Sequence, residues 1–423
     1  MTAGADVVVT GIGLITPAGH SHEVNWDALR RGRSLAVAGP DLAGLPVDFS
    51  SRVTGFDAEA ERGRARARRL DRFTQFALTA ARRAVADAGL DPGSRRGERV
   101  GVVLGVGSNS LSTYVAELCH LGAERPERVS PPALPHSIAN MAAGEVAIDL
   151  GACGPDFTTA GACASGATAI GAARDLLRSG ACDIVPAGGS ESARSRMTAT
   201  CFTRMRALSR RRDRPALASR PFDRARDGFV LGEGAAVLVL ERRATARQRH
   251  ARMLALLSGY GAGADAHHPV APHPGGAGAI RAVTAALDVA GCRPRDIGHI
   301  NAHGTSTALN DAAEAAALTQ VRGPHPGLRR AHAARHHVQG RHRARPGSRR
   351  CDPAAYTVLA LRHRGVPPVA DFERQDEERR LGIVAGRPRP TTGAAGVSCS
   401  FGFGGQNAVL LFTAVWDQED VRH

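Results

Sequence analysis

Residues 156–192 read DFTTAGACASGATAIGAARDLLRSGACDIVPAGGSES. The spacing of apolar residues after Cys163 predicts a helix from about Ala164 to Leu177, and the segment CDIVPAGG (182–189) predicts a buried strand. Cys163 therefore stands at a helix N-terminus, where the helix dipole lowers a thiol pKa from about 8.5 into a range of roughly 3.5–7.5. Small neighbours leave room for a substrate carbonyl and for oxyanion-binding backbone N–H groups. Spacing alone leaves two interpretations open, a nucleophile and a buried structural cysteine.

Similar units of strand and helix recur along the chain. Buried strands are predicted at 6–13, 99–107, 235–241, 255–263, 297–304 and 407–415, and an amphipathic helix at 72–90. Continuous apolar strands between helices predict an α/β fold whose sheet is covered on both faces. Residues 80–110 and 280–307 repeat the order of helix, Ala-Gly, Pro/Arg loop, strand and Gly-rich turn. This internal repeat predicts that the chain consists of two duplicated halves.

Composition narrows the class of protein. With 423 residues, 43% apolar and 22% charged, the chain is typical of a globular protein with a sizeable core. No stretch approaches the roughly 20 apolar residues of a membrane span, and the N-terminus lacks a signal-peptide pattern, so we expect a cytoplasmic protein. The eight cysteines form no CxxC pair, and we expect no metal.

Two glycine-rich motifs suggest nucleotide sites, and both lack a required element. GIGLITPAG (11–19) has Thr16 at the third glycine position of a dinucleotide fingerprint, and a tight strand-to-loop turn is preferred. FGFGGQN (401–407) lacks the Lys-Ser/Thr that completes a phosphate loop. Neither motif predicts a nucleotide cofactor.

Three further motifs follow the Cys163 segment along the chain. They are RPFDRARDGFVLGEGAAVLVLE (220–241), NAHGTSTALNDAAEAAAL (301–318) and SFGFGGQN (400–407). Together they resemble the β-ketoacyl-acyl carrier protein synthases, most closely the elongating type of fatty-acid and type II polyketide systems, over about Val7 to Phe412. The resemblance implies a thiolase-like five-layer αβαβα fold, with an N-terminal half at 1–250 that carries the nucleophile and a C-terminal half at 251–423. It also implies decarboxylative Claisen condensation of an acyl group with malonyl-acyl carrier protein.

The resemblance assigns roles to matching residues. Cys163 is the implied acyl-accepting nucleophile, and His303 is the first of two histidines that assist malonyl decarboxylation. Thr305 and Thr307 are implied to bind the pantetheine arm. Phe403 is the implied gating residue, whose backbone N–H joins that of Cys163 in an oxyanion hole. Asp311 and Glu314 are the implied structural support of the site, and no cofactor is implied beyond the carrier protein's phosphopantetheine.

One segment departs from the family pattern. Family members carry a lysine and, five residues later, the second histidine in a motif close to SKxxTGHxxGAAGAI. Here Arg329–Arg350 reads RRAHAARHHVQGRHRARPGSRR, with eight arginines, four histidines and no acid, and family-like sequence resumes at PAAYTVLALRH (353–363). A nucleic-acid arm and a metal cluster are two interpretations of such a tract.

A third interpretation explains more of this tract. If the reading frame moves by one base, codons that encode Gln339, His342, Arg343 and Ala344 also permit Lys, Thr, Gly and His. The shifted frame accommodates the whole missing motif, so we interpret about 326–352 as frame-shifted coding sequence. The sequence as written keeps Cys163 and His303 but lacks the lysine and the second histidine, and we expect it to accept an acyl group and to condense weakly.

Partners are implied by the same resemblance. We expect a homodimer or a ketosynthase heterodimer and an acidic acyl carrier protein. Docking of the carrier protein is one interpretation of the arginines of 64–69 and 206–212, and a solvated arginine-rich helix face is the other. We expect neither nucleic-acid nor membrane binding. The alternative function is a non-condensing partner subunit of a ketosynthase heterodimer, against which Cys163 argues because such partners usually lack the nucleophile.

Overall fold

The computed structural model describes residues 6–32, 34–91, 96–108, 110–322, 337–339, 352–376 and 381–415. Ten strands form one continuous sheet in the order β10-β9-β13-β14-β8-β1-β7-β6-β4-β5. Their bounds are β1 Val7–Ile15, β4 Val102–Gly105, β5 Asp156–Thr159, β6 Ile184–Ser192, β7 Glu233–Arg242, β8 Ala255–Ala264, β9 Ile297–Asn301, β10 His337–Gln339, β13 Ala395–Gly402 and β14 Gln406–Thr413. Two short pairs, β2 Val37–Ala38 with β3 Phe49–Ser50 and β11 Gly365–Val366 with β12 Arg389–Pro390, lie apart from it.

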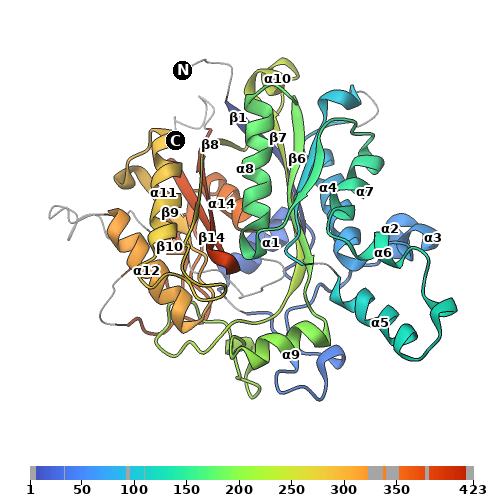
Figure 1. Ribbon diagram of the computed structural model, residues 1–423. Helices are drawn as coiled ribbons and strands as arrows, with labels where there is room; N and C mark the ends of the chain where they lie inside the picture. The colour runs from blue at the N-terminus through green and yellow to red at the C-terminus, as the bar shows by residue number, and fades with distance from the viewer. Residues whose placement is uncertain are drawn as a thin grey trace.

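The sheet divides where the two halves of the chain meet. Five strands from the first half end at β1, five from the second half begin at β8, and β1 and β8 pair through only two residue pairs, Val8 with Leu256 and Val9 with Ala255. This narrow junction lets the two five-stranded parts face each other across an inner layer of helices (Figure 1).

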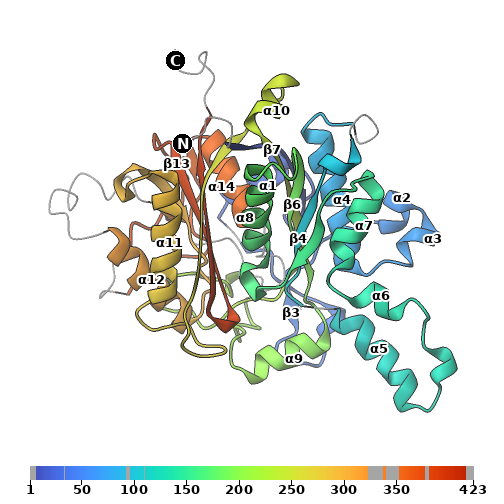
Figure 2. The ribbon, with the colours of Figure 1, turned by 45° about the horizontal axis from the view of Figure 1, so that its top comes forward.

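Helices form the remaining layers. Their bounds are α1 His22–Arg30, α2 Ala58–Arg62, α3 Arg64–Ala67, α4 Arg72–Asp87, α5 Leu111–Gly122, α6 Ala133–Ser137, α7 Met141–Leu150, α8 Ser165–Arg178, α9 Arg196–Arg204, α10 Arg243–Gln248, α11 Ala277–Ala290, α12 Ala308–Arg322 and α14 Asp352–Arg362. In Figures 1 and 2, α4 and α7 cover the outer face of the first half, α11 and α12 cover that of the second, and α8 and α14 lie between. The predicted five-layer αβαβα arrangement is confirmed, whereas a division near residue 250 stays a prediction.

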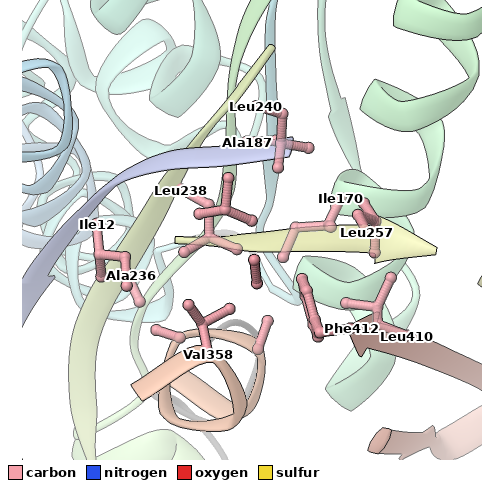
Figure 3. Close-up of a cluster of buried hydrophobic side chains, with 14 of the residues drawn as sticks. Ile12, Ile170, Ala187, Ala236, Leu238, Leu240, Leu257, Val358, Leu410 and Phe412 are labelled. Carbon is pink, nitrogen blue, oxygen red and sulfur yellow. The ribbon is translucent and has the colours of Figure 1, made fainter. Parts of the chain in front are cut away.

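The inner layer holds the largest core cluster. Figure 3 shows Ile170 of α8 and Val358 of α14 packed between Leu238 of β7 and Leu257 of β8. Small residues let α8 approach both sheets, because a Cβ added at Gly171 would lie 2.4 Å from the Tyr260 ring. Arg174 of α8 donates to the carbonyls of Leu257 and Ser258 and so links the halves.

Helix α14 shows that family-like packing resumes after the arginine-rich tract. Tyr356 donates to Asn25 at 2.9 Å, and the His363 ring stacks on Trp26 with centroids 4.5 Å apart, so α14 is docked on α1. An out-of-frame segment is expected to be irregular and to lie outside the core, but residues 337–339 form β10, which pairs with β9 at the edge of the main sheet. The rest of 326–351 lies outside the described residues.

Gly11 and Gly13 do not form the tight turn that the sequence suggested. Both lie within β1, which continues to Ile15, and the chain turns only at Thr16–Gly19. A Cβ at Gly11 would lie 2.1 Å from the Ala84 carbonyl oxygen, and one at Gly13 would lie 1.8 Å from that of Ala80. These glycines therefore allow α4 to pack closely against β1.

This packing gives a stability prediction. Gly13→Ala places a methyl group against the rigid backbone of α4, and we expect it to reduce the free energy of unfolding by about 3 kcal/mol. Gly39→Ala is the matched control, because no atom lies within 4 Å of its added Cβ, and its effect should stay within about 0.5 kcal/mol. Denaturant unfolding of both variants measures the difference, and equal stabilities would refute the close approach.

Candidate functional site

Cys163 occupies a strained turn between β5 and α8. It lies in the 3-10 turn Ala162–Ala164, two residues before the first residue of α8, rather than immediately before the helix as predicted. Ala162 has a positive φ of 46°, a conformation that non-glycine residues rarely adopt. The hydroxyl of Ser165 accepts from the Gly161 N–H at 2.9 Å and donates to the Ala162 carbonyl at 2.7 Å, which fixes this turn. The turn leaves Cys163 partly accessible.

The glycine-rich segment after β13 lies directly against this turn. A Cβ at Gly402 would lie 2.6 Å from the Gly161 carbonyl oxygen and 3.2 Å from the Cys163 backbone nitrogen. Gly404 and Gly405 adopt φ values of 79° and 70°, which bend the chain back into β14. Phe403 lies between Gly402 and Gly404, and its ring centroid is 6.1 Å from that of Phe202. Close backbone approach therefore explains the FGFGG motif.

His303 begins the turn that follows β9, and its side chain is buried. Glu314 of α12 accepts from the backbone N–H of His303 at 2.7 Å and from that of Gly304 at 2.8 Å. Asp311, one helical turn earlier, accepts from the Ser306 N–H with both oxygens at 3.1 Å. The two buried carboxylates thus hold a turn in which Ser306 has a φ of 67°. The chain's predicted structural pair lies where it can set the position of His303.

Thr305 and Thr307 lie on the same turn. Their hydroxyl oxygens are 2.7 Å apart, and the Thr305 hydroxyl also donates to Asp311 at 3.3 Å. This chain of hydrogen bonds connects the threonines to the carboxylates that support His303.

One cavity of about 720 Å³ brings the predicted residues together. Its wall includes Cys163, His303, Thr305, Thr307, Phe403 and Glu314, whereas Asp311 is not part of the wall and acts through the turn. The cavity is lined mainly by apolar side chains, which suits an acyl chain.

Several lining residues were not selected from the sequence. Phe401 packs edge-on to the His303 ring, with ring centroids 5.8 Å apart. The rings of Phe202 and Phe229 also pack edge-on, with centroids 5.2 Å apart. Phe401 and Phe229 lie within motifs that were recognised, so their place beside the chemistry was readable only as part of those motifs. Cys201 and Met205 of the α9 region lie outside any motif and carried no such signal.

Within the described ranges, no group of three or more His, Cys, Asp or Glu residues is arranged to hold a metal ion. Over the same ranges, no helix combines the length and apolar character needed to cross a membrane.

The chain is similar to known proteins over most of its length. Residues 5–246 match the model of the β-ketoacyl synthase N-terminal domain, and residues 254–373 match that of the C-terminal domain. A 3-oxoacyl-[acyl-carrier-protein] synthase 2 from Synechocystis is 39% identical over 413 residues, which cover 96% of this chain and 97% of that protein. The protein of the same name from Staphylococcus aureus is 37% identical over 417 residues, covering 97% of this chain and 99% of its own length.

Solved structures show the same fold. The ishigamide ketosynthase/chain length factor matches with a TM-score of 0.88 and 31% identity, covering 98% of this chain and all of that one. A ketosynthase solved in complex with its type II polyketide acyl-carrier protein matches with a TM-score of 0.85 and 26% identity, again covering 98% of this chain and all of that one. The chain therefore belongs to the β-ketoacyl synthase family of acyltransferases.

Proposed function

We propose that Cys163 accepts an acyl group from an acyl carrier protein and that the enzyme then condenses it with a malonyl-derived carbanion. The convergence of Cys163, His303 and Phe403 on one apolar cavity is the observation that carries this proposal. The family membership sets the reaction class, condensation in fatty-acid or polyketide synthesis, and the residue roles below are our assignment.

The acylation step requires three groups. The Cys163 thiol gives up its proton as its sulfur attacks the thioester carbonyl carbon. A new S–C bond forms, the C–S bond to pantetheine breaks, and the departing pantetheine thiolate takes up a proton. During attack the carbonyl oxygen becomes an oxyanion, and we assign its binding to the backbone N–H groups of Cys163 and Phe403. Their segments meet at Gly402, where a Cβ added to the glycine would lie 3.2 Å from the Cys163 backbone nitrogen.

In the condensation step, malonyl thioester loses CO₂ and the resulting enolate attacks the acyl-Cys163 carbonyl, which releases the thiolate. We assign His303 to hydrogen bonding of the enolate oxygen. Thr305 and Thr307 are assigned to binding of the pantetheine arm, because they share the cavity wall with His303. These interactions require His303 to stay fixed, which the Glu314 and Asp311 hydrogen bonds provide.

A buried polar row supports the frame-shift interpretation. Asn301 Oδ1, Ser398 Oγ and Ser400 Oγ are buried and lack a hydrogen-bond partner among the residues that the structure describes. Ser398 pairs with Asn301 across β13 and β9, and the backbone of position 339 in β10 pairs with Asn301 on its other side. Position 339 is where the shifted frame permits lysine, whose amine would supply the N–H donors that these oxygens lack. An unpaired buried polar group costs about 1–3 kcal/mol of folding free energy, so three such groups in one row indicate that a hydrogen-bond partner is missing there.

An exposed edge and an uncovered helix support a dimer. Strand β5 ends the sheet, and Phe157 on it is 39% exposed. Helix α5 buries none of its residues, and its Leu118 is 58% exposed. Figure 2 shows α5 and α6 standing away from the layers. We propose that a second ketosynthase chain, identical or related, covers this face, because a free strand edge and apolar side chains favour association.

Docking of an acidic carrier protein is proposed on arginines near the cavity. Arg206 lines the cavity and is exposed. Neighbouring Arg211 and Arg212 pair with Asp227 and Asp48 at 3.6 and 2.6 Å, so Arg206 is better placed to meet a partner's carboxylates. Exposed charges of this kind mainly raise the association rate.

The alternative is a partner subunit that does not condense. The ishigamide match includes a chain length factor, but this chain keeps a cysteine at the strained turn and a cavity that reaches it. These observations favour the acyl-accepting function.

The nucleophile assignment predicts selective labelling. A cerulenin-like epoxide should alkylate Cys163 before the three exposed thiols of Cys119, Cys153 and Cys201, because its acyl-like chain occupies the cavity. Peptide mapping by mass spectrometry identifies the modified residue, and Cys201→Ala is the control for the other cavity thiol. Labelling spread evenly over the cysteines would contradict the assignment of Cys163 as the nucleophile.

The frame-shift interpretation predicts a gain of function. Restoring the one-base frame over about 326–352 should raise malonyl decarboxylation and condensation by about 10²–10⁴-fold, since it returns two positioned groups. Both chains are assayed with the same carrier-bound substrates, and Cys163→Ala in the restored chain is the control. If the chain as written condensed as fast as the restored chain, the result would contradict the frame-shift interpretation and support a direct role for the arginine-rich tract.

A further inference from the structure

The short helices α2 and α3 carry basic residues but have almost no hydrophobic anchor. Helix α2 buries none of its residues, and α3 buries only Ala67. Arg64, Arg68 and Arg69 are exposed on this unit. Since apolar burial normally holds a helix in place, another interaction must fix the unit on the body of the protein.

That interaction centres on Asp149, near the end of α7, whose side chain is 2% exposed. Its oxygens accept from Arg82 of α4 at 2.6 and 2.7 Å and from Arg66 of α3 at 2.7 Å. Arg62, the last residue of α2, lies 3.5 Å away with its own side chain only 1% exposed. One buried carboxylate thus joins α2 and α3 to α4 and α7, which lie beside them in Figure 1.

The charges make this clasp depend on Asp149. Burial lowers the pKa of Arg62, and the charge of Arg82 lowers it further. Burial also raises the pKa of Asp149, but the hydrogen bond and charge of Arg82, with the other arginines, outweigh this and keep it below the usual value. Without the carboxylate, three guanidinium groups repel one another and Arg62 is buried beside two like charges. The ion pair of Arg83 in α4 with Glu61 in α2, at 2.9 Å and partly exposed, then remains, and we expect α2 and α3 to shift from their position.

We propose that Asp149 is a positioning residue for partner docking, which holds α2 and α3 so that their exposed Arg64 and Arg69, together with Arg206, meet the acidic carrier protein. This inference rests on the proposed function, because it requires a carrier-bound acyl donor. It assigns Asp149 no contact with substrate. Its effect is confined to recognition of the carrier.

The test compares two donors in acylation of Cys163. Asp149→Asn should raise the apparent KM for acyl-carrier protein about tenfold, while acylation by a small acyl-pantetheine thioester stays within about twofold. Asp183→Asn is the matched control, because Asp183 also binds two arginines, Arg99 and Arg242, at 3.0 and 3.2 Å. It should leave both donors within about twofold of the unmodified chain. Asp149→Glu, which keeps the charge, should restore most of the carrier affinity.

Further measurements separate docking from general damage. Oligomeric size is compared for all variants, because α7 also carries the exposed Ile148. If Asp149→Asn does not fold, Glu145→Gln removes the second carboxylate on Arg66, at 3.4 Å, and should raise the carrier KM by a smaller factor. An unchanged carrier KM, or equal losses with both donors, overturns the proposal. Failure of the unmodified chain to accept acyl from the small thioester refutes the proposed function instead.

Discussion

The binding of backbone N–H groups by two buried carboxylates is the constraint on which the site depends. Glu314 and Asp311 of α12 hold the turn from His303 to Ser306, and Asp311 also accepts from the Phe222 N–H at 2.7 Å. A carboxylate bound by backbone donors is a strong and directional contact. These bonds fix the turn that carries His303 and the two threonines on the cavity wall, with the strained Ser306 within it. Asp311 also holds the RPFD segment (220–223) against this turn.

Close backbone approach provides the second constraint. Cys163 and Phe403 come from different halves of the chain, and they meet because Gly402 has no side chain to separate their segments. The inner helix α8 begins at the Cys163 turn and packs on both five-stranded parts of the sheet, so the position of Cys163 is linked to the association of the halves. Cys399 of β13 is fully buried, and burial raises the pKa of its thiol well above the ordinary value, with the Glu314 charge raising it further.

The sequence predicted the layers and the residues at the cavity because each lay in a long motif or a periodic segment. It predicted Gly11 and Gly13 as a turn, since glycine after apolar residues usually ends a strand, whereas here the glycines admit a helix. The Asp149 clasp was not predicted, because its arginines and aspartate come from four helices and no periodicity connects them. Likewise, the buried row of Asn301, Ser398 and Ser400 depends on strand register. Tertiary contacts of this kind are invisible to motif analysis.

We propose that Cys163 and the cavity around it form a working acyl-accepting site whatever the state of the arginine-rich tract. The most direct measurement is intact mass and peptide mapping of the chain as written after incubation with a small acyl thioester. The account predicts one acyl group per chain, on the peptide that contains Cys163, and none on Cys163→Ala. Absence of acylation, or an acyl group on Cys201 in place of Cys163, would contradict it.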